Sequence, residues 1–156
     1  MPSLCLFGGI YTAYLATNTF TLIWTHSIEK VRWEEDYQIT AAGLVLNEAR
    51  IQGSGAGMEI PPNSTLVKMA GSNRPAFWRY QPVIAPLQTL SLAASNYTQD
   101  YTLCFLHRCQ PLRSLLSQRI PLLDLSEPHF QGIQLNSPYQ PRNLLSFGPT
   151  QLKACR

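Results

Sequence analysis

Charged side chains are scarce in this sequence. They make up 13% of its 156 residues, about half of the ~25% typical of globular proteins. Long surface helices need Glu and Lys on their solvent face, so this shortage argues against them. The 12 prolines and 9 glycines instead indicate short elements joined by turns. The length fits one domain with a genuine core and is too short for two domains of ordinary size.

Residues 3–28 contain no charged side chain at all, which raises the question of a membrane span or a signal peptide. A membrane helix needs ~20 predominantly apolar residues, but Gly, Thr and Asn interrupt this stretch repeatedly. A signal peptide begins with a basic segment, and no Lys or Arg precedes the stretch. We expect no transmembrane segment and no signal peptide, and predict strands at 4–8 and 10–16 with the Gly8-Gly9 pair as a bend between them.

Basic residues are not gathered in the way that nucleic-acid binding requires. Residues 1–60 carry six acidic and three basic side chains, a net charge of −3, whereas residues 61–156 carry three acidic and nine basic, a net charge of +6. Nucleic-acid-binding proteins cluster Lys and Arg on one face or helix, but here they are spread singly. We interpret them as a solvated surface and expect no nucleic-acid partner.

Cysteine is sparse as well: the chain has four, and Cys104 and Cys109 lie five residues apart. This spacing suits a disulfide that closes a tight β-turn. A metal site with His107 as a third ligand is the alternative, but zinc sites usually show closer spacing and a second pair of ligands. We favour a disulfide or free thiols, and expect no metal and no other cofactor. Disulfides would imply an oxidising compartment such as the periplasm.

Alternation with a period of two residues is the clearest structural signal. The segment 20–24 alternates in this way. In the segment 31–39, apolar side chains share one face and polar or charged side chains the other. After a turn at Ala42-Gly43, residues 44–52 predict a third strand. Residues 20–52 are therefore expected to form an antiparallel meander.

The rest of the chain predicts shorter elements. We expect strands within 64–69, 77–80, 89–93 and 101–106, and a helix at 110–118 in which Pro111 takes an early position. The fold predicted for residues 1–118 is a single all-β domain, an antiparallel β-sandwich or small barrel with one short helix near 111–118. Residues 119–150 contain five prolines and predict a poorly ordered tail, followed by a terminal strand within 151–156.

Glu35 interrupts the apolar face of the segment 31–39. A buried carboxylate is costly unless it is paired or protonated, so we expect a partner among His26, Lys30 and Arg50. Two roles stay open: a buried salt bridge that fixes strand register, and a ligand-binding or acid–base group. A third interpretation is that the assignment of faces is shifted by one residue and Glu35 is exposed.

His26 and Ser27 lie where a predicted strand meets a turn, which is a common place for site residues. A hydrolase using His26 and Glu35 with a serine or water is one hypothesis. Neighbouring residues on a strand point to opposite faces, so His26 is poorly placed to activate Ser27. No Gly-x-Ser-x-Gly motif accompanies them.

The glycine-rich segment 53–58 suggests a nucleotide site at first sight. A dinucleotide fingerprint needs Gly-x-Gly-x-x-Gly between a strand and a helix, but the spacing here is Gly-x-Gly-x-Gly and prolines follow. The nucleotide interpretation therefore fails. Two remain: a β-bulge, or a nest of backbone N–H groups at Gly55 and Gly57 that binds an anion.

The segments 20–30, 33–37 and 53–58, in this order, resemble the bacterial domain of unknown function 1850 (DUF1850) family. The resemblance covers about residues 3–116 and, more weakly, 152–155. Such proteins are similar to small reading frames beside components of tripartite ATP-independent periplasmic (TRAP) transporters, especially the TAXI type, whose receptors bind glutamate-like or other carboxylates. The resemblance implies an accessory role in uptake and a periplasmic or membrane-associated location, with no established activity.

The leading hypothesis combines this resemblance with the candidate residues. It is a non-enzymatic accessory protein that binds transporter subunits, or a small carboxylate or amino acid. No catalytic residue is assigned. The expected ligand-binding residues are His26, Ser27, Lys30, Glu35, Gly55 and Gly57. The alternatives are a hydrolase using His26 and Glu35, and a purely structural interaction module in which the motif locks a corner of the sheet.

Overall fold

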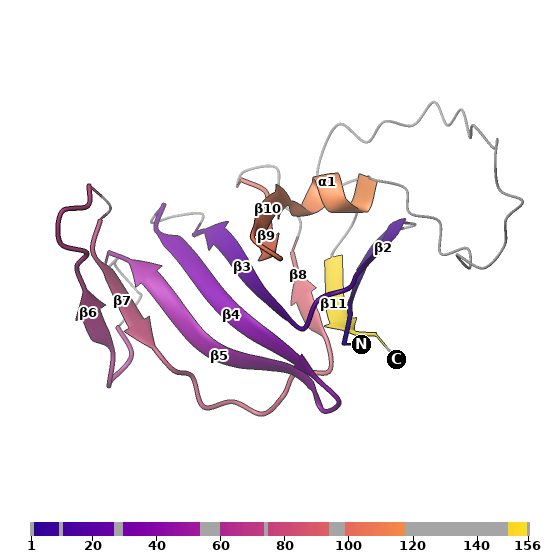
Figure 1. Cartoon of the computed structure of the whole chain (residues 1–156), viewed down its shortest axis with the longest axis horizontal. Coiled ribbons are helices and arrows are strands. Elements are labelled where there is room, and N and C mark those ends of the chain that lie inside the picture. Colours follow the sequence, from indigo (N-terminus) through magenta and orange to yellow (C-terminus); the bar gives the residue numbers. More distant parts are fainter. Residues whose placement is uncertain are drawn as a thin grey trace, which may run out of the picture.

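Two open antiparallel sheets make up most of the protein (Figure 1). The computed structural model describes residues 2–9, 11–26, 30–53, 60–73, 75–93, 99–117 and 150–155. The smaller sheet has the order β2–β1–β11–β8, and its strands are β1 (Leu4–Gly8), β2 (Tyr11–Leu15), β8 (Leu90–Leu92) and β11 (Thr150–Ala154). One short helix, α1 (Leu112–Ser117), accompanies the sheets.

The larger sheet has the order β10–β9–β3–β4–β5–β7–β6. Its strands are β3 (Thr19–Thr25), β4 (Arg32–Thr40), β5 (Gly43–Gln52), β6 (Thr65–Val67), β7 (Phe77–Tyr80), β9 (Thr102–Phe105) and β10 (Arg108–Pro111). The antiparallel meander expected over 20–52 is β3–β4–β5. The predicted all-β fold with one short helix is confirmed as a sandwich-like arrangement. The small barrel is wrong, because neither sheet closes on itself.

The core lies where the smaller sheet and α1 pack against one end of the larger sheet. Leu4 and Leu6 of β1 and Leu152 of β11 are fully buried there. From the larger sheet the core receives Phe20, Leu22, Tyr37, Ile39, Leu44 and Leu103, and from the helix Leu112, Leu115 and Leu116. The strand residues of this core are the apolar positions of the period-two pattern, so each strand buries one face.

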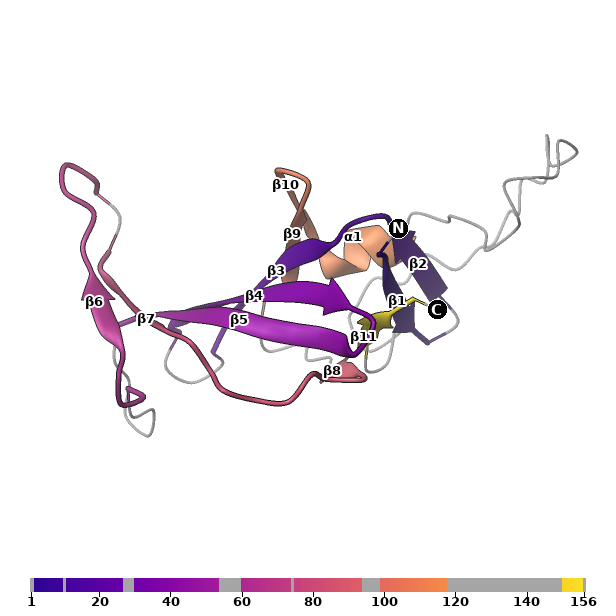
Figure 2. The same ribbon diagram turned by 60° about the horizontal axis from the view of Figure 1, so that its bottom comes forward.

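The larger sheet extends well beyond this core. In both views β6 and β7 lie at the end remote from β1, β2 and β11 (Figures 1 and 2). Cys5 and Cys155 form a disulfide that joins the two ends of the chain, 150 residues apart. The strand expected within 151–156 corresponds to β11, which pairs with β1 on one side and β8 on the other.

The helix begins later than the sequence predicts. Pro111 does not open it; it ends β10, where it pairs with Thr102. Leu112 follows, and its N–H donates to the carbonyl of Tyr101. A proline at a strand end loses only one ladder hydrogen bond, so this position is compatible with its chemistry. The tail predicted at 119–150 lies outside the described residues, Thr150 excepted. In the described part of the chain, no helix has the length and apolar character to cross a membrane.

Candidate functional site

The turn between β3 and β4 carries the first group of candidate residues. The N–H of His26 donates to the carbonyl of Val31 at 2.9 Å, and the N–H of Lys30 donates to the carbonyl of His26 at 3.0 Å. Lys30 has a φ of 55°, a left-handed conformation that is uncommon for a residue with a side chain. Its side chain is exposed. Ser27 lies outside the described residues.

The glycine-rich segment begins beside this turn. Gly53 directly follows β5 and has a φ of 81°, and a Cβ added there would lie 3.6 Å from Val31 Cγ1. The structure therefore brings the His26 turn and the start of the glycine-rich segment together at one end of the larger sheet. We call this region, defined by His26, Lys30, Val31 and Gly53, the motif end. Gly55 and Gly57 lie outside the described residues.

Aromatic rings form the inner face of the sheet next to the motif end. Trp24 and Trp33 are directly opposite each other in β3 and β4, and their rings stack with centroids 5.5 Å apart. Tyr101 tilts against Trp24 at 6.3 Å. Trp33 Nε1 is buried, and it has no hydrogen-bond partner among the described residues. This aromatic pair stabilises the part of the sheet that the smaller sheet does not cover.

Glu35 does lie on the apolar face, as its position in the pattern predicts. It is half-buried opposite Leu22 on one side and Ala49 on the other. Its carboxylate accepts a hydrogen bond from the Tyr37 hydroxyl. Burial raises the pKa of Glu35, and the Tyr37 hydrogen bond offsets only part of that rise. Burial and the neighbouring carboxylate likewise raise the pKa of Tyr37.

The partners proposed for Glu35 from sequence are therefore wrong. Arg50 points to the opposite face of the sheet, where it binds other carboxylates. Val31 is four residues from Glu35 on an extended strand, so the motif end lies roughly 14 Å from it. That distance exceeds the combined reach of the side chains. His26 and Glu35 thus do not form the hydrogen-bonded pair that the hydrolase hypothesis requires.

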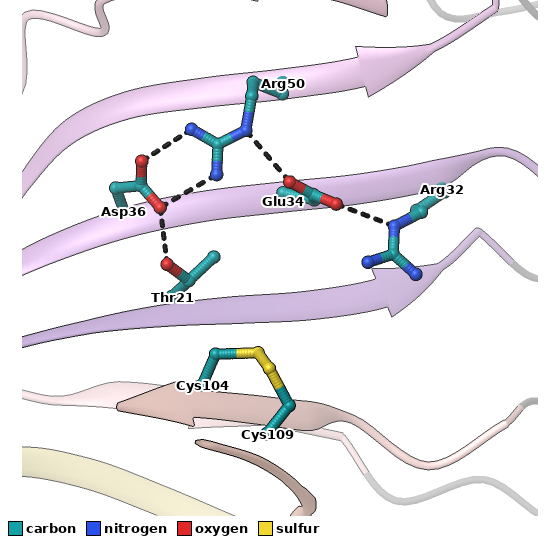
Figure 3. The surroundings of a disulfide bond; sticks show 7 residues. All are labelled: Thr21, Arg32, Glu34, Asp36, Arg50, Cys104 and Cys109. Atoms are coloured by element: carbon teal, nitrogen blue, oxygen red, sulfur yellow. Dashed lines mark hydrogen bonds and ion pairs between the residues drawn. A yellow bond between two sulfur atoms is a disulfide. The ribbon is translucent and has the colours of Figure 1, made fainter. Parts of the chain in front are cut away.

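The outward face of the sheet carries a connected network of charges centred on Arg50 (Figure 3). Its guanidinium donates to Glu34 at 2.9 Å, to both oxygens of Asp36 at 2.5 and 2.9 Å, and to Glu48 at 2.8 Å. Thr21 Oγ1 on β3 donates to Asp36 at 2.6 Å. The network therefore ties β3, β4 and β5 together across the side that faces away from the core.

Electrostatics within this network favour the ionised carboxylates. Burial alone would raise the pKa of Asp36, but hydrogen bonds from Arg50 and Thr21 lower it below its ordinary value. The pKa of Glu34 is likewise lowered, because hydrogen bonds from Arg32 and Arg50 outweigh burial. Hydrogen bonds to the carboxylates, that to Asp36 first, raise the pKa of Arg50. Each of the three guanidinium nitrogens of Arg50 donates to a carboxylate of the network.

A hollow of about 690 Å³ lies next to the network. Thr19, Thr21, Asp36 and Asn47 line its sheet side, and residues 104–109 of the β9–β10 hairpin line the other. Asn47 reaches it through a bulge: the register of β4 and β5 shifts between Asp36 and Tyr37 and skips Asn47. Bulges commonly redirect a side chain in this way.

The hairpin wall contains a disulfide and two basic residues. Cys104 and Cys109 are bonded to each other, so neither sulfur is free to join His107 in the metal site considered as an alternative. His107 and Arg108 are exposed at the rim. In the described ranges no ion pair involves Arg108. The hollow therefore has a cation on one wall and hydroxyl, amide and carboxylate groups on the other.

Sequence reasoning did not find this hollow. The alternation in 31–39 predicts the polar face of β4, but it does not single out Thr21, Asp36 or Asn47. A signal was present in β5, where the apolar residues Leu44 and Leu46 are followed by Ala49 and Ile51, a change from even to odd positions. Such a change marks a bulge in a strand that buries one face.

Comparison with known proteins gives one family. The model of the family described as "Domain of unknown function (DUF1850)" matches residues 20–112, more than half of the chain. The chain belongs to this family. The matched part of the DUF1850 protein runs from β3 to the start of α1 and includes the motif end, Glu35, the Arg50 network and the hollow. No curated protein and no solved structure matches the chain.

Proposed function

We propose that this DUF1850 protein is a non-catalytic accessory component of a TRAP-type uptake system, and that it binds a small carboxylate or amino acid in the hollow beside the β9–β10 hairpin. Family membership supports the accessory role through the association that the resemblance implies. The observation that carries the binding site is the hollow itself, with Arg108 on one wall and Thr21, Asp36 and Asn47 on the other. Its volume lies within the ~300–1,000 Å³ usual for small-molecule sites.

The chemistry of the lining favours an anion that also carries polar groups. Arg108 offers a fork of N–H donors that matches a carboxylate, and no ion pair within the described residues occupies it. Arg50 cannot serve, because three carboxylates already hold it. The Asn47 amide and the carboxylate of Asp36 suit the amino group of an amino acid. A solute with both a carboxylate and an amine therefore complements both walls.

A thermal-shift screen with glutamate, aspartate and four- and five-carbon dicarboxylates tests the site. At a ligand concentration ten times Kd, linkage gives about 1.4 kcal/mol of stabilisation, which corresponds to roughly 3–6 °C in melting temperature for a chain of this size. Arg108→Ala is expected to abolish the shift. Lys68→Ala, which removes an exposed positive charge outside the hollow, is the matched control and should keep it. Sodium chloride at equal ionic strength controls for screening.

Two outcomes would refute binding in the hollow: no stabilisation by any solute, or a shift that Arg108→Ala leaves intact. The transporter part is tested separately. A TRAP transporter is expressed in cells with and without the protein, and uptake of the stabilising solute is measured. Equal uptake with and without the protein would overturn the accessory role in uptake.

A purely structural interaction module is the second candidate, and the burial of Glu35 against Tyr37 favours it. In this case the motif end and Glu35 stabilise the larger sheet, and a partner protein binds the surface that the sheet presents. Loss of stability in His26→Ala, together with no effect of any solute on wild type, would support the module over the binding protein.

A further inference from the structure

The two disulfides of this protein differ in their position in the sheets. Cys104 and Cys109 lie directly opposite each other in the β9–β10 ladder, with Cα atoms 4.0 Å apart. The usual Cα separation in a disulfide is ~4.4–6.8 Å, so this pair is closer than normal. The Cα atoms of Cys5 and Cys155 are 5.3 Å apart, inside that range. In the β1–β11 ladder, Cys5 lies opposite Lys153 and not opposite Cys155. The Cα atoms of this second disulfide are therefore not held at the short distance of a directly opposed pair.

The turn that the Cys104–Cys109 disulfide encloses is unfavourable by itself. Its two central residues, Leu106 and His107, have φ values of 47° and 61°. Two-residue hairpins with positive φ at both positions are normally built from Asn-Gly or similar pairs. Leu and His carry side chains that disfavour this conformation. Opening the disulfide therefore allows Leu106 and His107 to leave the positive-φ conformation that their side chains disfavour.

Exposure differs between the disulfides as well. Cys109 is exposed, whereas Cys104, Cys5 and Cys155 are each half-buried. The Cys104–Cys109 disulfide lies next to Thr21 at the border of the charged network (Figure 3) and forms part of the hollow's wall. A reagent in solvent can thus approach this pair from the side of Cys109. Constrained and exposed disulfides are the ones that exchange with thiols most readily.

We propose that Cys104–Cys109 is a thiol–disulfide exchange site that accepts two electrons from a dithiol, while Cys5–Cys155 is a lasting structural cross-link. This proposal does not depend on ligand binding in the hollow. The register of the pair, the turn conformation and the exposure of Cys109 support it independently. Reduction would free the wall of the hollow from its cross-link.

The exchange proceeds in two balanced steps. A thiolate of the dithiol attacks Sγ of Cys109, the more exposed cysteine of the pair. The S–S bond breaks, and Cys104 leaves as a thiolate that takes up a proton. The second thiol of the reductant, after losing its proton, then attacks the mixed disulfide and releases Cys109, which is protonated in turn. The protein disulfide is reduced to two thiols, and the dithiol is oxidised to a disulfide.

A redox titration of the folded, full-length protein tests the assignment. The protein is equilibrated with increasing ratios of reduced to oxidised dithiothreitol, quenched by alkylation and digested, and labelling is measured at each cysteine by mass spectrometry. Cys104 and Cys109 should be half reduced at a ratio at least tenfold lower than Cys5 and Cys155, equivalent to about 30 mV. Simultaneous reduction of both pairs, or earlier reduction of Cys5 and Cys155, would overturn the proposal.

A second variant tests the cause without removing a cysteine. In Leu106→Asn/His107→Gly the turn has residues that favour positive φ, so the oxidised hairpin is less constrained. This variant should need several-fold more reductant to open Cys104–Cys109 than wild type, with Cys5–Cys155 unchanged. Reduction of the variant at the wild-type ratio would refute the role of the turn in making this pair reducible.

Discussion

Replacing Arg50 by Met is the most direct test of how the larger sheet is held together. Met keeps much of the length and apolar stem of the arginine but removes the guanidinium. The change leaves Glu34, Asp36 and Glu48 beside one another without their shared cation. All three carboxylates then face like charge on a surface where the Arg50 side chain is only 18% exposed.

The size of the effect follows from this exposure. Removing one partner of a buried ion pair costs ~3–5 kcal/mol. The carboxylates here are 24%, 35% and 26% exposed, so water partly compensates and the low end applies. We expect a loss of about 3 kcal/mol, or roughly 6–12 °C in melting temperature.

The pH dependence should distinguish wild type from the variant. The pKa values of Glu34 and Asp36 lie below their ordinary values of 4.5 and 3.8 in the folded wild type. Their contribution is therefore complete above about pH 4.5 and is lost as the pH falls through the folded pKa values. In Arg50→Met the Arg50 hydrogen bonds that lower the pKa of Asp36 are lost, whereas the burial that raises it remains. We therefore expect protonation of the carboxylates to cost the variant less stability than wild type. The gap between the two proteins should narrow as the pH falls from 7 to about 4.

Urea denaturation at several pH values measures both effects. Arg79→Met is the matched control, because Arg79 lies on the same face but is 50% exposed, and its one ion pair within the described residues is with Glu48, at 3.9 Å. An exposed pair of this kind contributes about 0.2–1 kcal/mol. Equal losses in Arg50→Met and Arg79→Met, or a gap that stays constant with pH, would show that the network does not stabilise the sheet.

Two further substitutions test the half-buried carboxylate of Glu35 and the first residue of β5, Gly43. Burial raises the pKa of Glu35, so the stability that the protonated carboxyl provides below pH 4.5 is lost as the pH rises through the folded pKa. In urea denaturation, the free energy of unfolding of Glu35→Gln should equal that of wild type at pH 4 and exceed it at pH 8. A variant that is less stable than wild type by the same amount at both pH values would contradict this. Gly43 has a φ of 123° and a Cβ there would lie 2.5 Å from the Leu87 carbonyl oxygen. Gly43→Ala should cost about 2–3 kcal/mol by the same measurement, against about 1 kcal/mol for Gly71→Ala, where nothing lies within 4 Å.

Period-two patterning was enough to locate most strands, because each strand of the meander buries one face. Glu35 was correctly placed on the apolar face, and the Cys104–Cys109 spacing was consistent with the hairpin found there. Both features depend on residues close together in the sequence. Local spacing determines such features, since the chain between the two positions leaves few alternative arrangements.

The partner of Cys155 could not be predicted in the same way. It lies 150 residues from Cys5, and β11 enters the smaller sheet between β1 and β8. Nothing in the alternation of a five-residue strand specifies which strands flank it. Once Cys104 is paired with Cys109, only Cys5 and Cys155 remain. The assumption that all four cysteines form disulfides would therefore have predicted the bond between them.

The bulge at Asn47 explains why the residues around it were misjudged. Without the register shift, the pairing of Tyr37 with Leu46 would continue regularly, and Glu35 would lie opposite Glu48 on the core face. Arg50 would then lie opposite Trp33 and also point into the sandwich. The shift by one residue places Ala49 opposite Glu35 and sends Arg50 outward to Glu34 and Asp36. A single extra residue thus decides that the Glu35 carboxylate on the inner face pairs with no cation of the described residues. It also decides that the charged network forms outside, beside the hollow.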